Sequence, residues 1–317
     1  MREKLASIEI GSHTARLLVA QDLGPSIPFR PLARRRAYIR LAQDFDYSAK
    51  RIIQPEAIDR TLEAVEGFLG CMKMFNVHSV HAVATGVVRE AANKDEFLDR
   101  IREYAGINVR PIDGSEEALL TGRGVLSALD IRGKPFLVFD LGGGSTEFLF
   151  RGEGETIIRS IPLGAAVLSQ EYLKSDPPDT TQLDALSRHI DGSLEKARLH
   201  TCTGLDHCPI IATGGTVTAL AAMIDRIALE EITPERVNGM ILKKSQVEGL
   251  LGGIQGLSVQ EMSSLPGLDA GRAELILAGS LIVIRILKFF ESVQLTISLS
   301  DLLEGILIDR LRGEGHV

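Results

Sequence analysis

A strand–turn–strand pattern that occurs twice constrains this chain more than any other feature of its sequence. In residues 135–150 an apolar run contains a lone acid near its end, Asp140, passes through Gly142, Gly143 and Gly144, and resumes as a second apolar run. Glycine contributes no side chain to a packed strand and costs backbone entropy there. It does allow backbone N–H groups to come close to an anion. The pattern therefore predicts an anion-binding turn between two strands, beside an acid suited to a hydrated Mg²⁺.

The second copy lies near the N-terminus. Residues 5–20 align with the first copy so that Glu9 falls on Asp140 and Gly11 on Gly142. Two such units in one chain indicate a duplicated domain.

A third glycine turn, at Gly214 and Gly215, differs because a helical pattern follows it. A turn of this kind directs a helix N-terminus at an anion. Strand and helix patterns alternate through the rest of the chain, which places it in the α/β class.

Composition narrows the possible partners. The 317 residues suffice for two domains, and 44% apolar with 24% charged residues is typical of a soluble globular protein. The net charge of −7 argues against a general nucleic-acid binder. A polyanionic ligand is still possible if basic side chains cluster in one region. The run Arg34–Arg36 is either a solvated strand face or part of such a cluster.

No segment of the sequence is predicted to cross a membrane. The N-terminal residues enter a strand at once without an apolar signal core. The longest apolar stretch, residues 275–290, contains Arg285 and Lys288 and is predicted to be a buried helix. Three cysteines favour a reducing compartment and free thiols, hence the cytoplasm. The group His200, Cys202, His207 and Cys208 has no standard zinc spacing.

Two further positions have both a structural and a functional reading. Arg89 follows a predicted strand, where it either binds an oxyanion or forms a surface salt bridge. Glu116 and Glu117 lie in the first turn of a predicted helix for which Ser115 is the expected N-cap. Carboxylates there are favoured by the helix dipole, and a catalytic role is the alternative.

Seven segments together resemble the successive motifs of the exopolyphosphatase / guanosine pentaphosphate phosphohydrolase (Ppx/GppA) family, in family order. They are residues 9–14, 84–93, 113–118, 140–147, 162–164, 213–216 and 265–274. The resemblance implies the actin/Hsp70/sugar-kinase fold, with two duplicated ribonuclease H-like α/β domains around a central cleft. It implies an N-terminal domain over 1–124, a C-terminal domain over 125–300, a last helix (about 301–317) that returns to the first domain, and the short two-domain form.

In that family the reaction is Mg²⁺-assisted (or Mn²⁺-assisted) hydrolysis of a terminal phosphoanhydride of inorganic polyphosphate or guanosine pentaphosphate. The resemblance makes Glu117 the base that orients the attacking water. It makes Asp140 and Glu147 acids for metal binding and water positioning, with Glu9 as a further metal ligand. The phosphate-binding residues that it implies are Gly11, Ser12, Arg89, Gly143, Gly144, Ser145, Gly214, Gly215 and Thr216. A cytoplasmic homodimer is expected, with no nucleic-acid or membrane partner.

The chain departs from the family pattern at several positions. Glu9 and His13 replace an aspartate and an asparagine, and Asp301 and Leu303 replace a glycine and an arginine. Two alternatives to the hydrolase therefore stay open: a catalytically weak member that binds polyphosphate or an alarmone as a regulator, and, less favoured, an ATP-dependent kinase of the same superfold.

Overall fold

The computed structural model describes residues 2–24, 29–43, 45, 50–131, 133–152, 154–199 and 208–312. The chain divides into two compact units. Unit 1 consists of Met1–Gly124 together with Asp301–Val317, and unit 2 consists of Val125–Ser300. No helix among the described residues is long and apolar enough to span a membrane.

Unit 1 is built on a five-stranded sheet with strand order β3-β2-β1-β4-β5. Its strands are β1 (Lys4–Ile10), β2 (Thr14–Asp22), β3 (Phe29–Tyr38), β4 (Ser79–Ala84) and β5 (Val109–Pro111). β1 is antiparallel to β2 and parallel to β4, and six of its seven residues are buried. Because successive side chains point to opposite faces, both faces of this central strand are covered.

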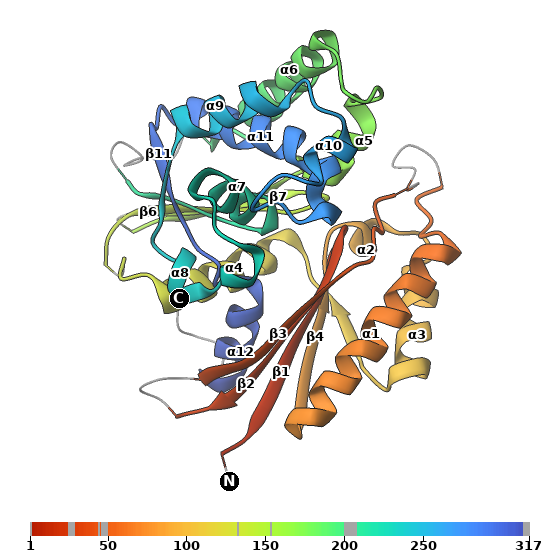
Figure 1. Ribbon diagram of the computed structural model, residues 1–317. Coiled ribbons are helices and arrows are strands. Elements are labelled where there is room, and N and C mark those ends of the chain that lie inside the picture. The colour runs from red at the N-terminus through yellow and green to blue at the C-terminus, as the bar shows by residue number, and fades with distance from the viewer. Residues whose placement is uncertain are drawn as a thin grey trace. The chain divides into compact units, whose positions relative to one another are not determined.

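Unit 1 also contains helices, some of which pack on its sheet (Figure 1). They are α1 (Pro55–Phe75), α2 (Val87–Glu90), α3 (Lys94–Ala105), α4 (Gly114–Ala128, which continues into unit 2) and α12 (Leu302–Arg312). α1 begins at Pro55, since proline is compatible with the first helical turn. It ends at Asn76, which takes a left-handed conformation with φ of 52°.

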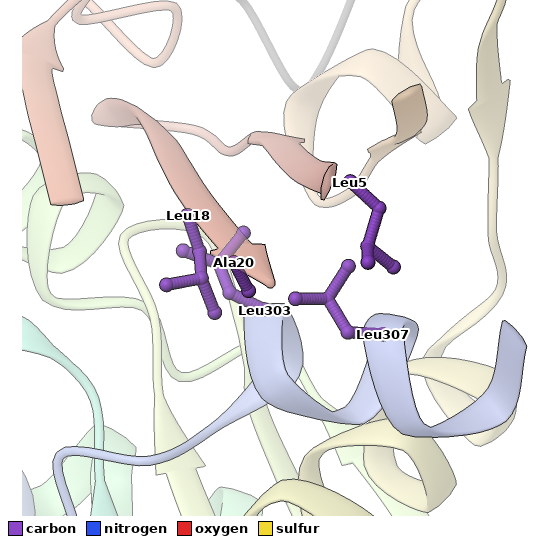
Figure 2. Close-up of a cluster of buried hydrophobic side chains, with 5 residues drawn as sticks. All are labelled: Leu5, Leu18, Ala20, Leu303 and Leu307. Carbon is purple, nitrogen blue, oxygen red and sulfur yellow. The ribbon is translucent and has the colours of Figure 1, made fainter. Parts of the chain in front are cut away.

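The last helix packs against the first two strands of the chain. Figure 2 shows Leu303 and Leu307 of α12 with Leu5, Leu18 and Ala20 of β1 and β2 in one buried apolar cluster. Leu303, which replaces the arginine of the family pattern, is therefore a core residue with 3% of its surface exposed.

α12 also meets the backbone of α4. A Cβ on Gly305 would lie 1.8 Å from the carbonyl oxygen of Leu120, and one on Gly124 would lie 1.9 Å from that of Asp301. Only glycine permits this approach. The contact fixes the start of α12 against the helix that carries Glu117.

Unit 2 has a six-stranded sheet with strand order β10-β11-β9-β6-β7-β8. Its strands are β6 (Phe136–Leu141), β7 (Thr146–Arg151), β8 (Thr156–Ile161), β9 (Ile210–Thr213), β10 (Ile241–Lys243) and β11 (Gln294–Ile297). Its helices are α5 (Ala165–Tyr172), α6 (Thr180–Lys196), α7 (Gly215–Asp225), η2 (Leu229–Glu231), α8 (Pro234–Val237), α9 (Lys244–Ile254), α10 (Val259–Met262), η3 (Ala270–Leu275) and α11 (Ile276–Phe289).

α11 is the central helix of unit 2, in contact with α5, α6, α7 and α9 (Figure 1). Eleven of its fourteen residues are buried, as predicted for the apolar stretch. The two mixed sheets with their helices confirm the α/β class.

The two hairpins that suggested duplication have the same hydrogen bond across their turns. The N–H of Gly11 donates to the carbonyl of Thr14 at 3.0 Å, and the N–H of Gly142 donates to that of Ser145 at 3.0 Å. In both sheets the first hairpin strand also pairs in parallel with a strand from later in the chain.

One local prediction was wrong. Ser115 was expected to cap α4, but the Asp113 carboxylate accepts the N–H groups of Ser115 and Glu116, both at 2.9 Å. A carboxylate two residues earlier caps this helix because it reaches two N–H groups of the first turn at once.

Candidate functional site

The turn after β1 is held by contacts with the loop after β4. The hydroxyl of Ser12 accepts the N–H of Val87 at 3.0 Å. Gly86 lies against it with φ of 51°, and a Cβ there would lie 2.1 Å from the Ser12 oxygen. The predicted phosphate-binding residues Gly11 and Ser12 therefore sit at the carboxyl end of β1, next to the loop that leads to Arg89.

His13 is packed rather than exposed. Its ring meets that of Tyr38 edge-on at 5.3 Å between centroids, and its carbonyl accepts the N–H groups of Ile39 and Arg40, both at 3.0 Å. The segment after β3 therefore holds the turn after β1 through these two backbone hydrogen bonds.

Arg89 and Glu117 are brought into direct contact. Nη1 of Arg89 donates to Oε2 of Glu117 at 3.2 Å and to the carbonyl of Ile112 at 3.0 Å. Glu117 is buried, with 6% of its surface exposed, in the first turn of α4. Its neighbour Glu116 is instead paired with Arg110 at the surface. The buried acid of the two is the one that the family resemblance assigned as base.

Glu9 is part of an ion cluster with Arg16 and Asp301. The Arg16 guanidinium donates to the carboxylates of both acids. Burial raises the pKa of Glu9 above its usual value, the Arg16 charge lowers it, and the Asp301 carboxylate raises it further. A second buried acid, Glu304, is paired with Arg34, and burial raises its pKa as well.

The turn of unit 2 is held from the other side by α5. The carbonyl of Gly142 accepts the N–H of Ala165 at 3.0 Å, and that of Gly143 accepts the N–H of Ala166 at 3.0 Å. A Cβ on Gly164 would lie 2.2 Å from the carbonyl carbon of Gly144, so glycine is required there. With its carbonyls engaged by the helix start, the turn is fixed in position.

Four oxygen-bearing side chains form a row across the sheet of unit 2. Register pairs Thr213 with Asp140, Asp140 with Glu147, and Glu147 with Ser160. Directly paired residues share one face of a sheet. Oε1 of Glu147 accepts the hydroxyls of Ser145 at 2.7 Å and of Ser160 at 2.8 Å.

This row fits a hard cation. Its donors are all oxygen, which Mg²⁺ and Mn²⁺ prefer, and the buried hydroxyl of Thr213 has no hydrogen-bond partner within the described part of the chain. No three His, Cys, Asp or Glu side chains in that part form a ready metal cluster. A cation here would accordingly use one or two carboxylates and take its other ligands from water or phosphate, as Mg²⁺ usually does.

The third glycine turn lies beside the same row. Gly214 has φ of 102°, and a Cβ there would lie 2.9 Å from Oδ1 of Asp140. Gly215 is the first residue of α7. Thr216 is buried, and its methyl group lies 2.1 Å from where a Cβ on Gly279 of α11 would be.

Arg272 lies at the third glycine turn, a position that the sequence did not reveal. Its guanidinium lies on Gly215, where a Cβ would be 1.9 Å from Nη2, and the residue is 8% exposed. A buried cation at a glycine turn that opens a helix is suited to an anion. Arg272 lies inside the motif at 265–274, but it is 57 residues from the turn, so spacing alone could not place it there. Of the cysteine and histidine group considered for zinc, His200, Cys202 and His207 fall outside the described residues, and only Cys208 lies within them.

A scan against protein families matches the model of the Ppx/GppA phosphatase family over residues 18–314. The chain belongs to this family. Exopolyphosphatase 2 of Mycobacterium tuberculosis is 29% identical over 321 residues, which cover 96% of this chain and 98% of the relative. Exopolyphosphatase 1 of Mycobacterium leprae is 27% identical over 98% of this chain and 90% of its own length.

Solved structures of the family have the same fold. The exopolyphosphatase of Cytophaga hutchinsonii superposes with a TM-score of 0.87 at 26% identity, covering 98% of both chains. The Ppx/GppA family member of Aquifex aeolicus has a TM-score of 0.78 at 27% identity and covers 100% of both chains. The predicted family and fold are thus confirmed, and so is the prediction that the protein is a hydrolase.

Proposed function

We propose that this hydrolase is an exopolyphosphatase that releases orthophosphate from the end of inorganic polyphosphate with the help of Mg²⁺ or Mn²⁺. The observation that carries the proposal is the buried Glu117 held by Arg89, in a chain whose second unit has an oxygen-lined row beside two glycine turns. Its relatives named exopolyphosphatase match along nearly their whole length. A cytoplasmic homodimer is part of the same proposal.

Phosphoryl transfer depends on in-line positioning and on neutralising charge at the equatorial oxygens. Asp140 and Glu147 would hold the cation, which supplies Lewis-acid neutralisation when bound. The N–H groups of Gly143, Gly144, Gly214 and Gly215, with the Arg272 guanidinium, would hold phosphate oxygens. The hydroxyls of Ser145 and Ser160 keep the Glu147 carboxylate in one orientation.

Glu117 would orient the attacking water and accept its proton. Such a base contributes about 10²- to 10⁴-fold to the rate. The Arg89 contact keeps this carboxylate in a fixed direction and balances its charge before substrate arrives. Arg89 in turn donates to the Ile112 carbonyl, so the arginine that holds Glu117 is itself fixed by the backbone.

The test is orthophosphate release with Mg²⁺ from long-chain polyphosphate, guanosine pentaphosphate and ATP in parallel. Wild type is compared with Glu117→Gln and with the matched control Glu116→Gln, whose carboxylate lies at the surface against Arg110. We expect release from polyphosphate to fall at least about 100-fold in Glu117→Gln and to be unchanged in Glu116→Gln.

Each other outcome has a definite meaning. Release from guanosine pentaphosphate in preference to polyphosphate would replace the substrate and keep the mechanism. Equal activity of wild type and Glu117→Gln would exclude Glu117 as the base. Tight polyphosphate binding without release, in folded wild type, would favour the regulator over the enzyme.

A further inference from the structure

The two hairpins differ in charge at one equivalent position. In unit 2 the row across β6 and β7 pairs Asp140 with Glu147, so two acids are neighbours. In unit 1 the equivalent row across β1 and β2 pairs Glu9 with Arg16. The next strand, β3, adds Arg36 to this row, opposite Arg16. The acid of unit 1 therefore has cations where the acid of unit 2 has a carboxylate and a hydroxyl.

The Glu9 carboxylate is directed at the guanidinium. Oε2 of Glu9 accepts Nε of Arg16 at 2.5 Å and is also paired with Nη2, so two nitrogens converge on one oxygen. Nη1 is paired with Oδ2 of Asp301, and that side chain is 3% exposed. One arginine thus joins an acid of β1 to an acid at the start of α12.

Asp301 is fixed independently of this ion pair. Its Oδ1 accepts the N–H of Leu303 at 3.1 Å, and its own N–H donates to Glu304 Oε2 at 3.0 Å. This is a reciprocal capping box at the N-terminus of α12. The Gly124 contact also places the Asp301 backbone directly against α4.

The geometry points to Asp301 as a positioning residue that holds the Arg16 guanidinium on Glu9, so that Glu9 fixes the Gly11–Thr14 turn and does not ligate the divalent cation. The inference rests on the proposed function for its kinetic part only. It assigns the cation to the Asp140–Glu147 row. Glu9 and Asp301, two departures from the family pattern, then have no part in metal binding.

Charge and geometry both support this assignment. A cation that bound Oε2 of Glu9 would have to displace a guanidinium that makes two contacts with that oxygen, and Oε1 lies against Gly11, 3.2 Å from where a Cβ would be. Mg²⁺ demands near-octahedral oxygen geometry, and the adjacent fixed positive charge opposes its binding because like charges repel. The longer side chain of Glu9, compared with aspartate, serves to reach Arg16 on the neighbouring strand.

A neighbouring ion pair provides a matched control. Arg34 of β3 is paired with Glu304, one turn into α12, on the same face of the sheet. It likewise joins the sheet of unit 1 to α12, but Arg34 stands opposite Leu18, one row further from the turn. Asp301→Asn and Glu304→Gln each remove one buried charge, and both new side chains can still cap α12.

The first measurement is Mn²⁺ binding to the full chain, followed by electron paramagnetic resonance without substrate. We expect Glu9→Gln and Asp301→Asn to bind Mn²⁺ within about twofold of wild type, and Glu147→Gln to bind it at least about tenfold more weakly. Glu9→Asp keeps the charge and covers the case in which Glu9→Gln does not fold. Weakening of about tenfold or more in a folded Glu9 variant would overturn the assignment.

The second measurement separates KM from kcat for polyphosphate. Asp301→Asn should raise KM at least about fivefold with kcat within about twofold, because a turn that is less well fixed binds the substrate less well. Glu304→Gln should change neither. Equal kinetic effects of the two variants would reduce Asp301 to a purely structural residue. Wild type that releases no phosphate would sink the proposed function, whereas the Mn²⁺ comparison would still decide the role of Glu9.

Discussion

Arg16 and Glu147 occupy equivalent positions in the two hairpins, each directly opposite the strand acid of its own unit. Arg16 pairs in register with Glu9, and Glu147 pairs with Asp140. The duplicated backbone has therefore acquired opposite charges at one position. A fixed guanidinium suits a turn that only holds anions, whereas a second carboxylate suits a turn that also holds a cation.

The Arg89–Glu117 contact predicts that lysine will not replace Arg89. Both contacts come from Nη1 at the tip of the guanidinium, and the lysine side chain is shorter, so its ammonium cannot reach Glu117 and the Ile112 carbonyl from the same place. Displacement of a catalytic group by about 1 Å costs on the order of 100-fold. We expect Arg89→Lys to lower kcat/KM for polyphosphate by about 10- to 100-fold.

Steady-state kinetics with a surface control checks this prediction. Arg51→Lys alters an exposed pair with Glu90, a type of interaction that contributes little. Its kcat/KM should match wild type. An Arg89→Lys enzyme as active as Arg51→Lys would show that the charge alone suffices.

The position of Arg272 on Gly215 predicts a role in substrate binding. Hydrogen bonds to charged groups are worth about 1.5–3 kcal/mol, so Arg272→Met should raise KM for polyphosphate by about 10- to 100-fold. Arg285→Met removes another arginine of unit 2, whose partner is Asp191 on α6. That variant should lose stability in thermal unfolding but keep KM. Unchanged KM in folded Arg272→Met would assign this arginine to packing.

Much of the fold and part of the site could be predicted from the sequence because the signals are local. The glycine turns, the Pro55 helix start and the buried helix within 275–290 each follow from neighbouring residues. The family resemblance named Glu117, Asp140 and Glu147 as candidates, and the spacing of the two hairpins indicated that the chain is duplicated.

The remaining features depend on contacts between distant residues. The ion pair from Arg16 to Asp301 spans 285 positions, and Arg272 reaches its glycine turn only in the folded unit. Ser115 and Asp113 are both good capping residues, and only the backbone geometry decides between them. Leu303 could not be recognised as core without the strands that it covers.

The close approach of α12 to α4 predicts a specific stability effect. Gly305→Ala would place a Cβ 1.8 Å from the Leu120 carbonyl oxygen, which is backbone and cannot move aside without shifting a helix. Overpacking of this kind costs about 1–3 kcal/mol or more. The control is Gly253→Ala in α9, where the Cβ meets open space. It should be neutral or stabilise by up to about 1 kcal/mol. The measurement is urea unfolding of the two variants. Equal midpoints would contradict the close contact between Gly305 and Leu120.

Burial of Glu304 predicts an unusual dependence of stability on pH. Its pKa is raised in the folded state chiefly by burial, with the Arg34 charge opposing the shift and Asp301 adding to it. The folded protein therefore binds this proton more tightly than the unfolded chain does. The stabilisation is fully present below the unfolded value of about 4.5 and is lost as pH rises through the folded pKa.

Glu304→Gln cannot ionise, so its free energy of unfolding should decline less steeply than that of wild type above pH 4.5, by at most about 1.4 kcal/mol per pH unit. Urea unfolding from about pH 3 to 8 measures both slopes. Glu261→Gln serves as the opposite control, because hydrogen bonds from the Ser258 backbone and side chain lower the pKa of Glu261. Its difference from wild type should instead appear as pH falls below about 4.5. Parallel curves for wild type and Glu304→Gln above that pH would mean that Glu304 stays charged at no cost, with Arg34 fully compensating its burial.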